Sequence, residues 1–433
     1  ACRLAGAGLR PILYERAGRL GGRAASFHDR VSGEDVDYGH HVSMRCCTVT
    51  HGFLQRIRAT SAIRYQPELS VPILCGQDRS LLRSTSFLPG ALHLAPALLA
   101  YRFLTGRERL AVLRAGAALY FAARSDEPFG DWLRARRQNA RAIERLWDPI
   151  CVATLNAHVD DVGLPAARKV FLDGFFSPHC AGLGLFTAPL SRVFDAASAY
   201  VESHGGEIRT STTVRRIHAK AGRACAVELA DGKTLEAEAV ITAIPPWDLP
   251  ALVPGEVLAP TLGQADRLTW SPIVNVHLWF DRPVFDDDFV IAVDSPIQAA
   301  FNVTRLHSSE SGSGSHLVIS QSAADRWVDR RPDEIVDCLA AALRDLIPVA
   351  RKARLVRRLV LKHRRATFVP TPGVDGLRSS SKTPIEGLYL AGDWTATGWP
   401  ATIEGAILSG IIAAARAEEA VRADVPPSDD DLT

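Results

Sequence analysis

The chain has 433 residues, of which 47% are hydrophobic and 23% are charged. This length suits two or three lobes around a large core, and a formal net charge of +2 gives no reason to expect a nucleic-acid partner. The eight cysteines include no Cys-x-x-Cys pair. Their spacing is wrong for zinc, so we expect free thiols in a reducing cytoplasm and no metal site. No apolar run is long enough to span a bilayer.

The first predicted elements are the end of a helix and a short buried strand over Pro11–Tyr14, which leads to Glu15. Since this helix would begin in mid-turn and the only methionine is Met44, we expect the natural N-terminus to lie upstream of Ala1. An acid at the end of the second strand of a Rossmann unit accepts both ribose hydroxyls of an adenosine. Glu15 is therefore a candidate for that role, with a solvated acid as the alternative.

A glycine-rich turn follows at Arg19–Arg23. Gly21 and Gly22 allow the backbone to approach a pyrophosphate, and a flanking arginine such as Arg23 neutralises its charge. An ordinary surface loop is the alternative for this turn taken alone.

Two histidines, His40 and His41, follow a predicted strand over Val36–Tyr38. A histidine at this place is a candidate proton donor near neutral pH. A structural histidine with satisfied hydrogen bonds is the alternative.

Two helical regions come next. Phe87–Ala123 is apolar with a helical pattern, divided at Thr105. A second helix over residues 140–158 holds Trp147, Asp148 and Asn156. Because Asp148 precedes a proline, we expect it to cap this helix.

The middle of the chain is typical of short strands with one helix before them. We expect that helix over Phe194–Ser203, closed by Gly205 and Gly206. The predicted strands are Glu207–Thr210, Val214–Ala219, Ala224–Leu229 and Ala239–Ile244, with a hairpin turn at Asp231-Gly232. The strand that begins at Val214 either offers backbone groups to an adenine or is a plain core strand.

Three further elements precede the C-terminal motif. Residues 270–280 alternate as a strand of period two, His307–His316 predicts a mobile Ser/Gly-rich loop, and Pro332–Ile347 predicts an amphipathic helix.

The C-terminal motif begins with a buried strand over Leu388–Ala391, which leads to Gly392 and Asp393. Asp393 is a candidate to bond the ribityl or diphosphate part of a flavin. Trp394 and Trp399 flank this segment, where they either line a pocket or simply pack.

The next predicted helix begins near Ala401 and runs to Ala417. The N–H groups at its start, from Ala401 to Ile403, carry partial positive charge, which suits the flavin edge that becomes anionic on reduction. We expect Gly405 to let the flavin ring approach closely. The alternative is a plain strand, loop and helix capped by Thr402.

With these residues identified, the chain resembles the amine-oxidase and phytoene-desaturase superfamily of flavoproteins, through Glu15-Arg16, Arg19–Arg23 and residues 37–41 and 392–406. Within it, the chain is similar to the hydroxysqualene dehydroxylase group, through residues 147–156, 271–283 and 392–406. The similarity extends from residue 1 to about residue 420. The chain departs from the family pattern because the first strand and its GxGxxG loop are absent, and because Tyr38 replaces the family's usual polar residue.

The resemblance implies an α/β fold, in which a discontinuous Rossmann-type FAD-binding domain accompanies a mixed α+β substrate domain. We expect the FAD-binding domain over residues 1–45, 190–247 and 357–422, the substrate domain over 46–189 and 248–356, and a disordered tail over 423–433. The resemblance also implies that FAD is bound by Glu15, Arg16, Gly21, Gly22, Arg23, Val214, Gly392, Asp393, Ala401, Thr402 and Ile403.

The activity that the resemblance implies is removal of the hydroxyl of hydroxysqualene to give squalene, a step of bacterial hopanoid biosynthesis with a C30 isoprenoid substrate. A carotenoid or phytoene desaturase, an amine-oxidase type of enzyme and a non-catalytic isoprenoid-binding protein are the alternatives. The electron donor stays open. The catalytic candidates are His40, Trp147, Asn156, Trp394 and Trp399.

The apolar region over Phe87–Ala123 has two interpretations. It forms either two core helices or the mouth for a C30 hydrocarbon at a membrane interface, and its interleaved arginines favour the interface. These arginines are Arg102, Arg107, Arg109 and Arg114. We therefore expect a cytoplasmic protein with peripheral contact to the inner face of the bacterial membrane.

Overall fold

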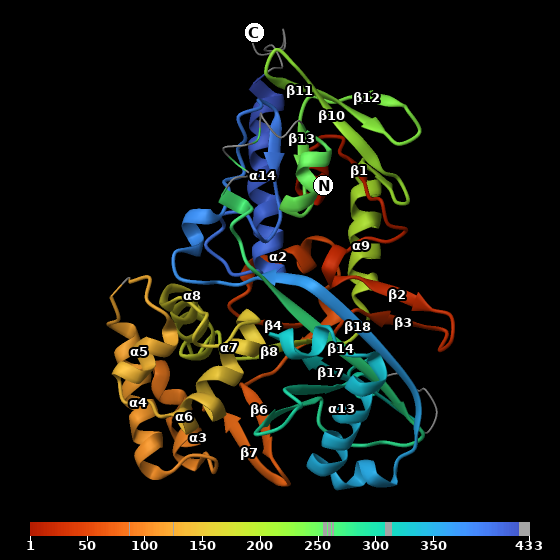
Figure 1. Ribbon diagram of the computed structural model, residues 1–433. Helices are drawn as coiled ribbons and strands as arrows, with labels where there is room; N and C mark the ends of the chain where they lie inside the picture. Colours follow the sequence, from red (N-terminus) through yellow and green to blue (C-terminus); the bar gives the residue numbers. More distant parts are fainter. Residues whose placement is uncertain are drawn as a thin grey trace.

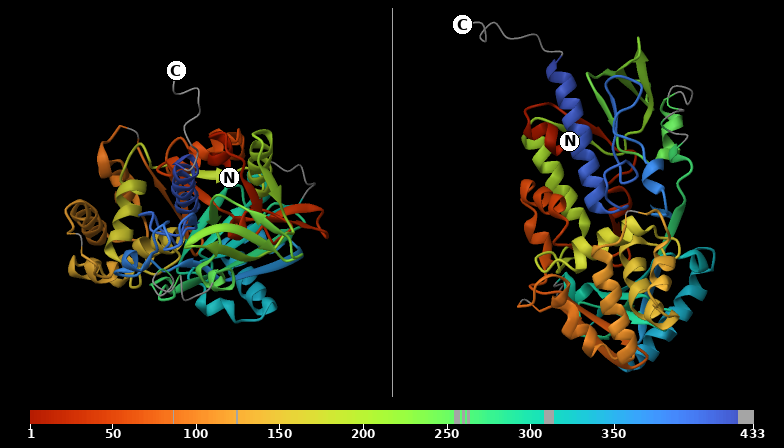
Figure 2. Two further views of the ribbon diagram at one scale, coloured as in Figure 1. Left: turned by 90° about the horizontal axis from the view of Figure 1, so that it is seen from above. Right: turned by 90° about the vertical axis from the view of Figure 1, so that its left-hand side faces the viewer.

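The computed structural model describes residues 1–85, 87–123, 125–253, 258, 261, 264–307 and 314–423. Figure 1 shows two lobes stacked along the long axis of the molecule, with the N-terminus in the upper one, and Figure 2 shows the same arrangement from above and from the side. Most of the predicted mobile loop, residues 308–313, and residues 424–433 of the predicted tail lie outside the described residues.

The upper lobe is built on short parallel strands with helices beside them. Strand β1 (Ile12–Tyr14) pairs in parallel with β9 (Glu207–Arg209), and β13 (Val240–Thr242) pairs in parallel with β19 (Leu388–Leu390). The helices of this lobe are α1 (Cys2–Gly6), α9 (Leu190–Ser203) and α14 (Ile403–Ala423). Parallel strands joined through helices are the α/β arrangement that the sequence predicts.

A three-stranded antiparallel sheet stands at the top of this lobe (Figure 1). Its strands are β10 (Val214–Lys220), β11 (Arg223–Leu229) and β12 (Thr234–Glu236). The predicted hairpin turn lies between β11 and β12, where Gly232 has a φ of 87°. Strand β12 is only three residues long, and no sequence pattern predicts it.

The strand predicted at Ile12 is present as β1, but it is not buried as expected. Ile12 is 40% exposed, because β1 pairs with β9 along one edge only among the described residues. The other edge faces the large cavity described below, whose lining includes Ile12, Leu13 and Tyr14.

The lower lobe contains a seven-stranded mixed sheet in the order β18-β14-β17-β16-β15-β6-β7. The bounds of these strands are Leu355–Phe368, Trp270–Phe280, Ser315–Gln321, Ala299–Asn302, Phe289–Val293, Ser70–Cys75 and Asp78–Arg83, respectively. Helix α13 (Pro332–Leu346) packs on one face.

The strand predicted over residues 270–280 is confirmed as β14. Its even-numbered side chains, such as Val274 and Val276, share a core cluster with α13, while the odd-numbered Asn275 and His277 face the other way. These two polar side chains are also buried, at 5% and 1% exposure. The alternation therefore separates two buried faces rather than core from solvent.

A helical region flanks this sheet and contributes its own core around Trp132, Trp147 and Phe171. The predicted apolar region becomes α3 (Ala95–Ala100) and α4 (Gly106–Tyr120) after a 3-10 turn. Thr105 caps α4 through a reciprocal pair of hydrogen bonds with Glu108. The other helices are α5 (Phe129–Ala135), α6 (Ala140–Ala142), α7 (Asp148–Leu155) and α8 (Leu164–Lys169), with π-helical turns over Ile143–Trp147 and Val170–Phe175.

Short elements join the two lobes. They are the hairpin of β2 (Ser26–Asp29) and β3 (Glu34–Asp37), the sheet of β4 (Val42–Met44), β8 (Leu183–Phe186) and β5 (Ile63–Tyr65), and helix α2 (Thr48–Arg56). The short helices α11 (Val303–Leu306) and α12 (Asp325–Val328) belong to the lower lobe.

One predicted domain boundary falls inside a strand. Residue 357 lies within β18, which pairs with β14 along most of its length. The strand belongs to the large sheet of the lower lobe, so the return to the upper lobe comes after Phe368. The sequence does not predict this, because β18 is assigned to the large sheet by its pairing with β14, a contact between segments that are distant in the sequence.

All eight cysteines are free in the structure. Within the described residues, no helix is long and apolar enough to cross a membrane, and no cluster of histidine, cysteine or acidic side chains has the arrangement of a metal site.

Candidate cofactor and substrate site

A cavity of about 3030 Å³ is lined by residues of both lobes. Its upper part lies against β1, β13 and the start of α14. Its lower part, the apolar chamber, lies between the helical region and the large sheet. The chamber is lined by Val71, Ile73, Leu82, Ile150, Leu183, Phe289, Ile291 and Phe301.

Glu15 follows β1 and lines the upper cavity. One carboxylate oxygen accepts the backbone N–H of Ala17 at 2.7 Å, which fixes the side chain beside the strand end. Arg16 also lines this cavity, where its side chain is 72% exposed and lies 3.4 Å from Asp248 of the same lining. The acid and the neighbouring arginine are therefore both placed at the cavity.

The glycine-rich turn also meets the cavity. Gly21 has a φ of 108°, and a Cβ there would lie 2.5 Å from the Phe194 ring, so this glycine is required by packing against α9. Gly22 has a φ of 56°, and no atom lies within 4 Å of where its Cβ would be. Gly22, rather than Gly21, thus provides open backbone.

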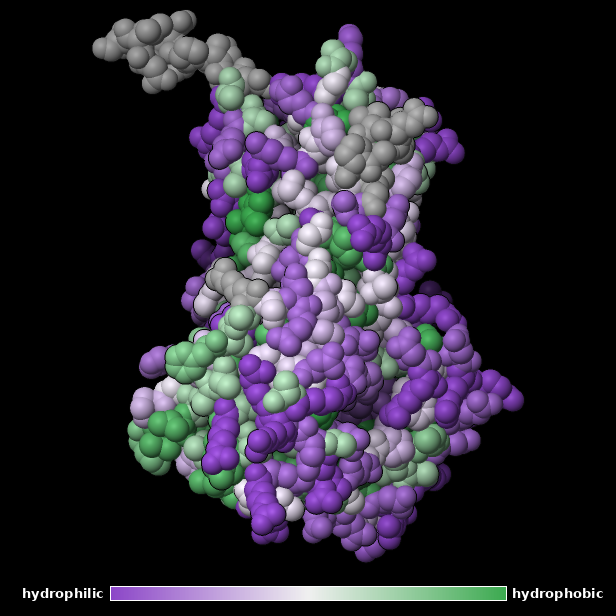
Figure 3. Space-filling view, turned by 60° about the vertical axis from the view of Figure 1, so that its left-hand side comes forward, coloured by the Kyte–Doolittle hydropathy of each residue, from purple (hydrophilic) through white to green (hydrophobic). Residues whose placement is uncertain are grey.

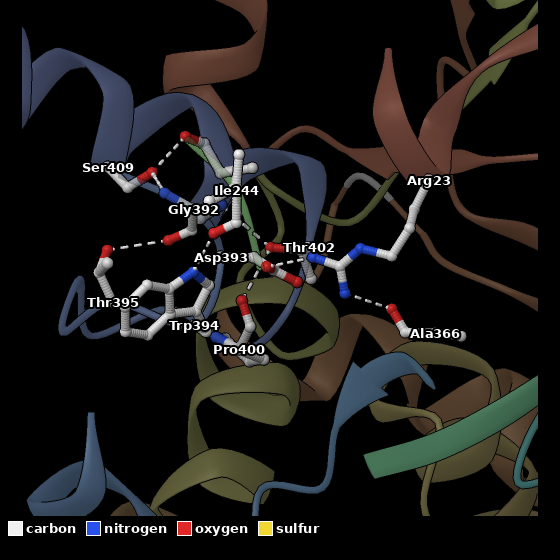
Figure 4. Close-up of polar contacts among 12 residues, drawn as sticks. Arg23, Ile244, Ala366, Gly392, Asp393, Trp394, Thr395, Pro400, Thr402 and Ser409 are labelled. Atoms are coloured by element: carbon white, nitrogen blue, oxygen red, sulfur yellow. Dashed lines mark hydrogen bonds and ion pairs between the residues drawn. The ribbon is translucent and has the colours of Figure 1, made fainter. Parts of the chain in front are cut away.

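Arg23 and Asp393 join the two motifs that lie at opposite ends of the sequence (Figure 4). The guanidinium donates to the Asp393 carboxylate and, at 2.6 Å, to the carbonyl of Ala366. Asp393 is 6% exposed. A carboxylate this buried needs a charged partner, and Arg23 supplies it.

The turn at Gly392 follows directly after β19. Its φ of 130° lies in the region that favours glycine, and its N–H donates to Ser409 Oγ of α14 at 2.8 Å. Trp394 lies under this turn with 1% exposure, and its indole N–H donates to the carbonyl of Ile244 at 3.1 Å. Trp394 therefore packs in the core of the lobe while it also lines the cavity.

Helix α14 begins at the cavity. Thr402 caps it, because its hydroxyl accepts the N–H of Gly405 at 3.1 Å. Ala401, Thr402 and Ile403 all line the cavity, so the positive end of a 21-residue helix faces it. A Cβ on Gly405 would lie 2.8 Å from the carbonyl oxygen of Pro400. This glycine is required by the preceding loop, which corrects the expectation that it makes room for a ring.

Arg378, which no sequence motif predicts as a site residue, has a side chain that is 2% exposed. Its guanidinium donates to the carbonyls of Asp393 at 3.0 Å and Thr395 at 2.5 Å, and to Thr397 Oγ1 at 3.1 Å. Burial lowers the pKa of Arg378. One buried side chain thus fixes the loop between β19 and α14, and no local motif marks it.

We expect Arg378→Lys to lower the free energy of unfolding by about 1–3 kcal/mol, because an ammonium cannot reproduce a planar fork of donors. FAD retention should fall as the loop loosens. Urea unfolding and the flavin content of the purified protein measure the two effects. Arg358→Lys is the control, since this half-exposed arginine pairs with Asp333 at the surface. Equal losses in both variants would contradict the role of Arg378.

His40 lies between the cavity and the large sheet, with its ring centroid 4.7 Å from that of Phe301. Burial lowers the pKa of His40 to about 3. The lowered pKa leaves the His40 imidazole neutral near pH 7, and its buried Nε2 has no hydrogen-bond partner among the described residues, so the alternative of a histidine with satisfied hydrogen bonds does not hold for His40. The neighbouring His41 bonds to the carbonyl of Gly39 at 2.9 Å.

Trp147 and Asn156 have structural roles, which corrects their selection as catalytic candidates. Trp147 is 2% exposed, stacks edge-on against Phe171 and donates to Gln138 Oε1 at 3.0 Å. Asn156 ends α7 with a φ of 53° and is 5% exposed. Its amide donates to Thr367 Oγ1 at 2.8 Å and accepts the N–H of Ala323 at 2.6 Å, so its polar atoms are satisfied.

Asp148 does not cap its own helix as expected. Its carboxylate accepts the backbone N–H of Val159 at 2.9 Å and lies 2.9 Å from His158 Nδ1. The side chain therefore anchors the segment after α7. A capping pattern describes only contacts within the first turn of a helix, so it does not predict this contact.

Two remaining candidates line the cavity. Val214 begins β10 and pairs with Leu229, so its backbone is part of a ladder at the cavity edge. Trp399 lies on the loop before α14, and the ammonium of Lys169 lies 4.1 Å from its ring centroid.

These features fit a flavin dinucleotide. An acid at a strand end, an open glycine turn and a helix N-terminus lie along one cavity. In flavin dinucleotide sites, these three groups bind the ribose, the diphosphate and the anionic flavin edge, respectively. The cavity volume of about 3030 Å³ is larger than the upper limit of about 1,000 Å³ that is typical of small-molecule sites. The cavity therefore has room for a second large ligand beside the cofactor.

Comparison with known proteins identifies the family. The model of the family described as flavin containing amine oxidoreductase matches residues 1–417. The chain belongs to this family. It is an FAD-dependent oxidoreductase, and FAD is its cofactor.

Individual relatives refine the comparison. The chain is 25% identical over 431 residues to the 15-cis-phytoene desaturase of Capsicum annuum, covering 95% of this chain and 74% of that protein. It is 27% identical over 429 residues to hydroxysqualene dehydroxylase of Sinorhizobium fredii, covering 95% and 93%. The structure of an oxidoreductase from Methanosarcina mazei has a TM-score of 0.74 at 16% identity and covers 95% of both chains, which confirms the fold.

Proposed function

We propose that this protein removes the hydroxyl of hydroxysqualene to give squalene. The observation that carries the proposal is the similarity to the Sinorhizobium fredii enzyme, which extends over 93% of that protein. The apolar chamber supports it, because a long hydrocarbon binds against a wall of predominantly apolar side chains. The oxidoreductase class and the cofactor follow from the family, and the particular substrate is the proposal.

The chemistry suits this site. An allylic alcohol loses water once a proton reaches its oxygen, and FAD, when bound and reduced, would supply the hydride that quenches the resulting delocalised cation. The chamber excludes water from that cation.

We also propose which part of the cofactor each residue contacts. Glu15 binds the adenosine ribose, Gly22 and Arg23 lie beside the diphosphate, and the start of α14 at Ala401–Ile403 faces the flavin ring. Asp393 acts with Arg23 at the junction, and Val214 lies near the adenine. In this division the upper lobe is the FAD-binding domain and the lower lobe is the substrate domain.

A second candidate is desaturation of a carotenoid precursor. The 25% identity to the Capsicum annuum desaturase over 431 residues favours it. Such an enzyme takes hydride from the hydrocarbon, so electrons flow in the opposite direction through the same cofactor.

One pair of assays separates the two candidates. The FAD-loaded protein is given hydroxysqualene with reduced flavin in one arm, and phytoene with an oxidant in the other. We expect squalene in the first arm and unchanged phytoene in the second. Desaturated phytoene without squalene would reject the first candidate in favour of the second.

We further propose that the protein contacts a membrane surface through an apolar patch on the helical region. Figure 3 shows hydrophobic surface gathered low on the face that includes this side of the molecule. The patch comprises Phe87, Leu92, Leu99, Leu110, Tyr120 and Phe121, which are 43% to 90% exposed. Several large apolar side chains that are exposed within one region of the chain, here residues 87–121, are typical of an interaction surface.

Phe121→Ser is expected to weaken binding to anionic vesicles by about tenfold, because Phe121 is 90% exposed and would bury its ring in the interface. Vesicle flotation measures the effect. Val31→Ser is the matched control, since Val31 is 78% exposed on the β2–β3 hairpin, away from the patch. No vesicle binding by the unmodified protein, or equal losses in both variants, would contradict the proposal.

A further inference from the structure

A lysine lies in the wall of the cavity beside the apolar chamber. Lys169 ends α8 with 27% of its side chain exposed, and it lines the cavity together with Val170, Gly174 and Phe175. Its Nζ lies 4.1 Å from the ring centroid of Trp399 and 3.0 Å from Asp173 Oδ2. A cation is thus held in the cavity wall between one carboxylate and one aromatic ring.

The direction of this side chain is specific. The preceding Arg168 turns the other way and donates to the carbonyl of Leu119 in the helical region. Lys169 instead faces Trp399, three residues before the helix cap Thr402. The ammonium therefore lies where the chamber meets the loop that leads to α14.

We propose that Lys169 binds the oxygen of an isoprenoid alcohol in the chamber and so selects an alcohol over a hydrocarbon. This inference rests on the proposed function and specifies its substrate class. An ammonium has three donors. One is used by Asp173 and another points over Trp399, which leaves a donor for the one acceptor that such a substrate carries.

This arrangement has a consequence for turnover. A substrate oxygen held at Lys169 places the neighbouring carbon beside Trp399 and the start of α14. The product of hydroxyl removal has no acceptor, so it loses this contact and binds more weakly. A purely hydrocarbon substrate would gain nothing from the lysine.

The alternative is that Lys169 only forms a helical ion pair with Asp173, at the i,i+4 spacing. Two substitutions separate the roles. Lys169→Met keeps the length of the side chain and removes its donors, while Asp173→Asn removes the pair and leaves the ammonium. Lys233→Met removes the same charge from the β11–β12 turn, where Lys233 is 75% exposed.

The test is equilibrium binding of farnesol and of its matched hydrocarbon farnesene, followed by tryptophan fluorescence, so it does not depend on turnover. We expect the unmodified protein, Asp173→Asn and Lys233→Met to bind the alcohol about tenfold more tightly than the hydrocarbon. Lys169→Met should lose this preference while its affinity for the hydrocarbon changes less than twofold.

Two results would overturn the inference. If Lys169→Met keeps the preference for the alcohol, the lysine does not bind the oxygen, and the proposed function is untouched as long as squalene is still formed from hydroxysqualene. If the unmodified protein shows no preference, the inference also fails. Failure to bind either ligand, together with no squalene formation, would count against both the inference and the proposed function.

Discussion

Gly392→Ala is expected to lower the free energy of unfolding by about 2–4 kcal/mol and to release FAD. Gly392 has a φ of 130°, which costs any L residue roughly 1–3 kcal/mol. A Cβ there would also lie 2.7 Å from Trp394 Nε1, whose indole is buried and cannot move freely. Relief of that clash would displace Asp393 and with it the partner of Arg23.

Gly52→Ala is the matched control for this prediction. Gly52 lies within α2, where no atom is within 4 Å of its Cβ position, and helix propensity favours alanine by up to about 1 kcal/mol. Chemical unfolding and the flavin absorbance of each purified variant give both readouts. A Gly392→Ala protein as stable and as yellow as the Gly52→Ala protein would contradict the strained turn.

The second large effect is loss of stability in acid. Burial lowers the pKa of His40 and His277 to about 3 and that of His307 to about 4. It also lowers the pKa of His316, which lies 3.0 Å from His277. The unfolded chain binds protons at these histidines near pH 6.5, whereas the folded protein does not. Their contribution is therefore complete above pH 6.5 and is lost as the pH falls from that value toward 3.

Asp37 opposes this trend. Burial raises its pKa to about 6, so the folded state binds its proton before the unfolded state does. Protonation of Asp37 in the folded state therefore offsets part of the stability that the buried histidines lose in acid. We expect the free energy of unfolding to fall by about 3 kcal/mol or more between pH 6.5 and pH 4.

His277→Phe identifies the source of the acid effect. His277 is 1% exposed, and its replacement should reduce by about one the number of protons taken up on unfolding in this pH range. Urea unfolding at a series of pH values measures that number. His179→Asn is the control, because His179 is exposed. An unchanged pH dependence in His277→Phe would show that these histidines do not destabilise the protein in acid.

The sequence predicts most helices and strands here because their signals are local. The capped helix after Thr105, the turn at Gly232 and the alternating strand over 270–280 all depend on neighbours within a few residues. Burial depends on distant segments, and so the prediction fails there. Ile12 is exposed because one edge of β1 is unpaired among the described residues.

The site shows the same division. Sequence motifs predict Arg23 and Asp393 separately, but only the fold shows that they pair across 370 residues. Trp394 and Gly405 belong to the motif that marks the cofactor site, and they serve the packing of its loop. Arg378 and Lys169 carry no motif, since each acquires its role from a loop that is distant in sequence. A sequence motif thus predicts where a site lies, but it does not predict which contacts each of its side chains makes.

The central claim, reductive removal of a hydroxyl, is tested most directly by a single turnover without oxygen. The FAD-loaded protein is reduced, excess reductant is removed, and hydroxysqualene is added while flavin absorbance and squalene are measured together. We predict reoxidation of the flavin with one squalene formed for each flavin oxidised. Flavin that stays reduced with no squalene formed, or that is oxidised without squalene, would contradict the claim.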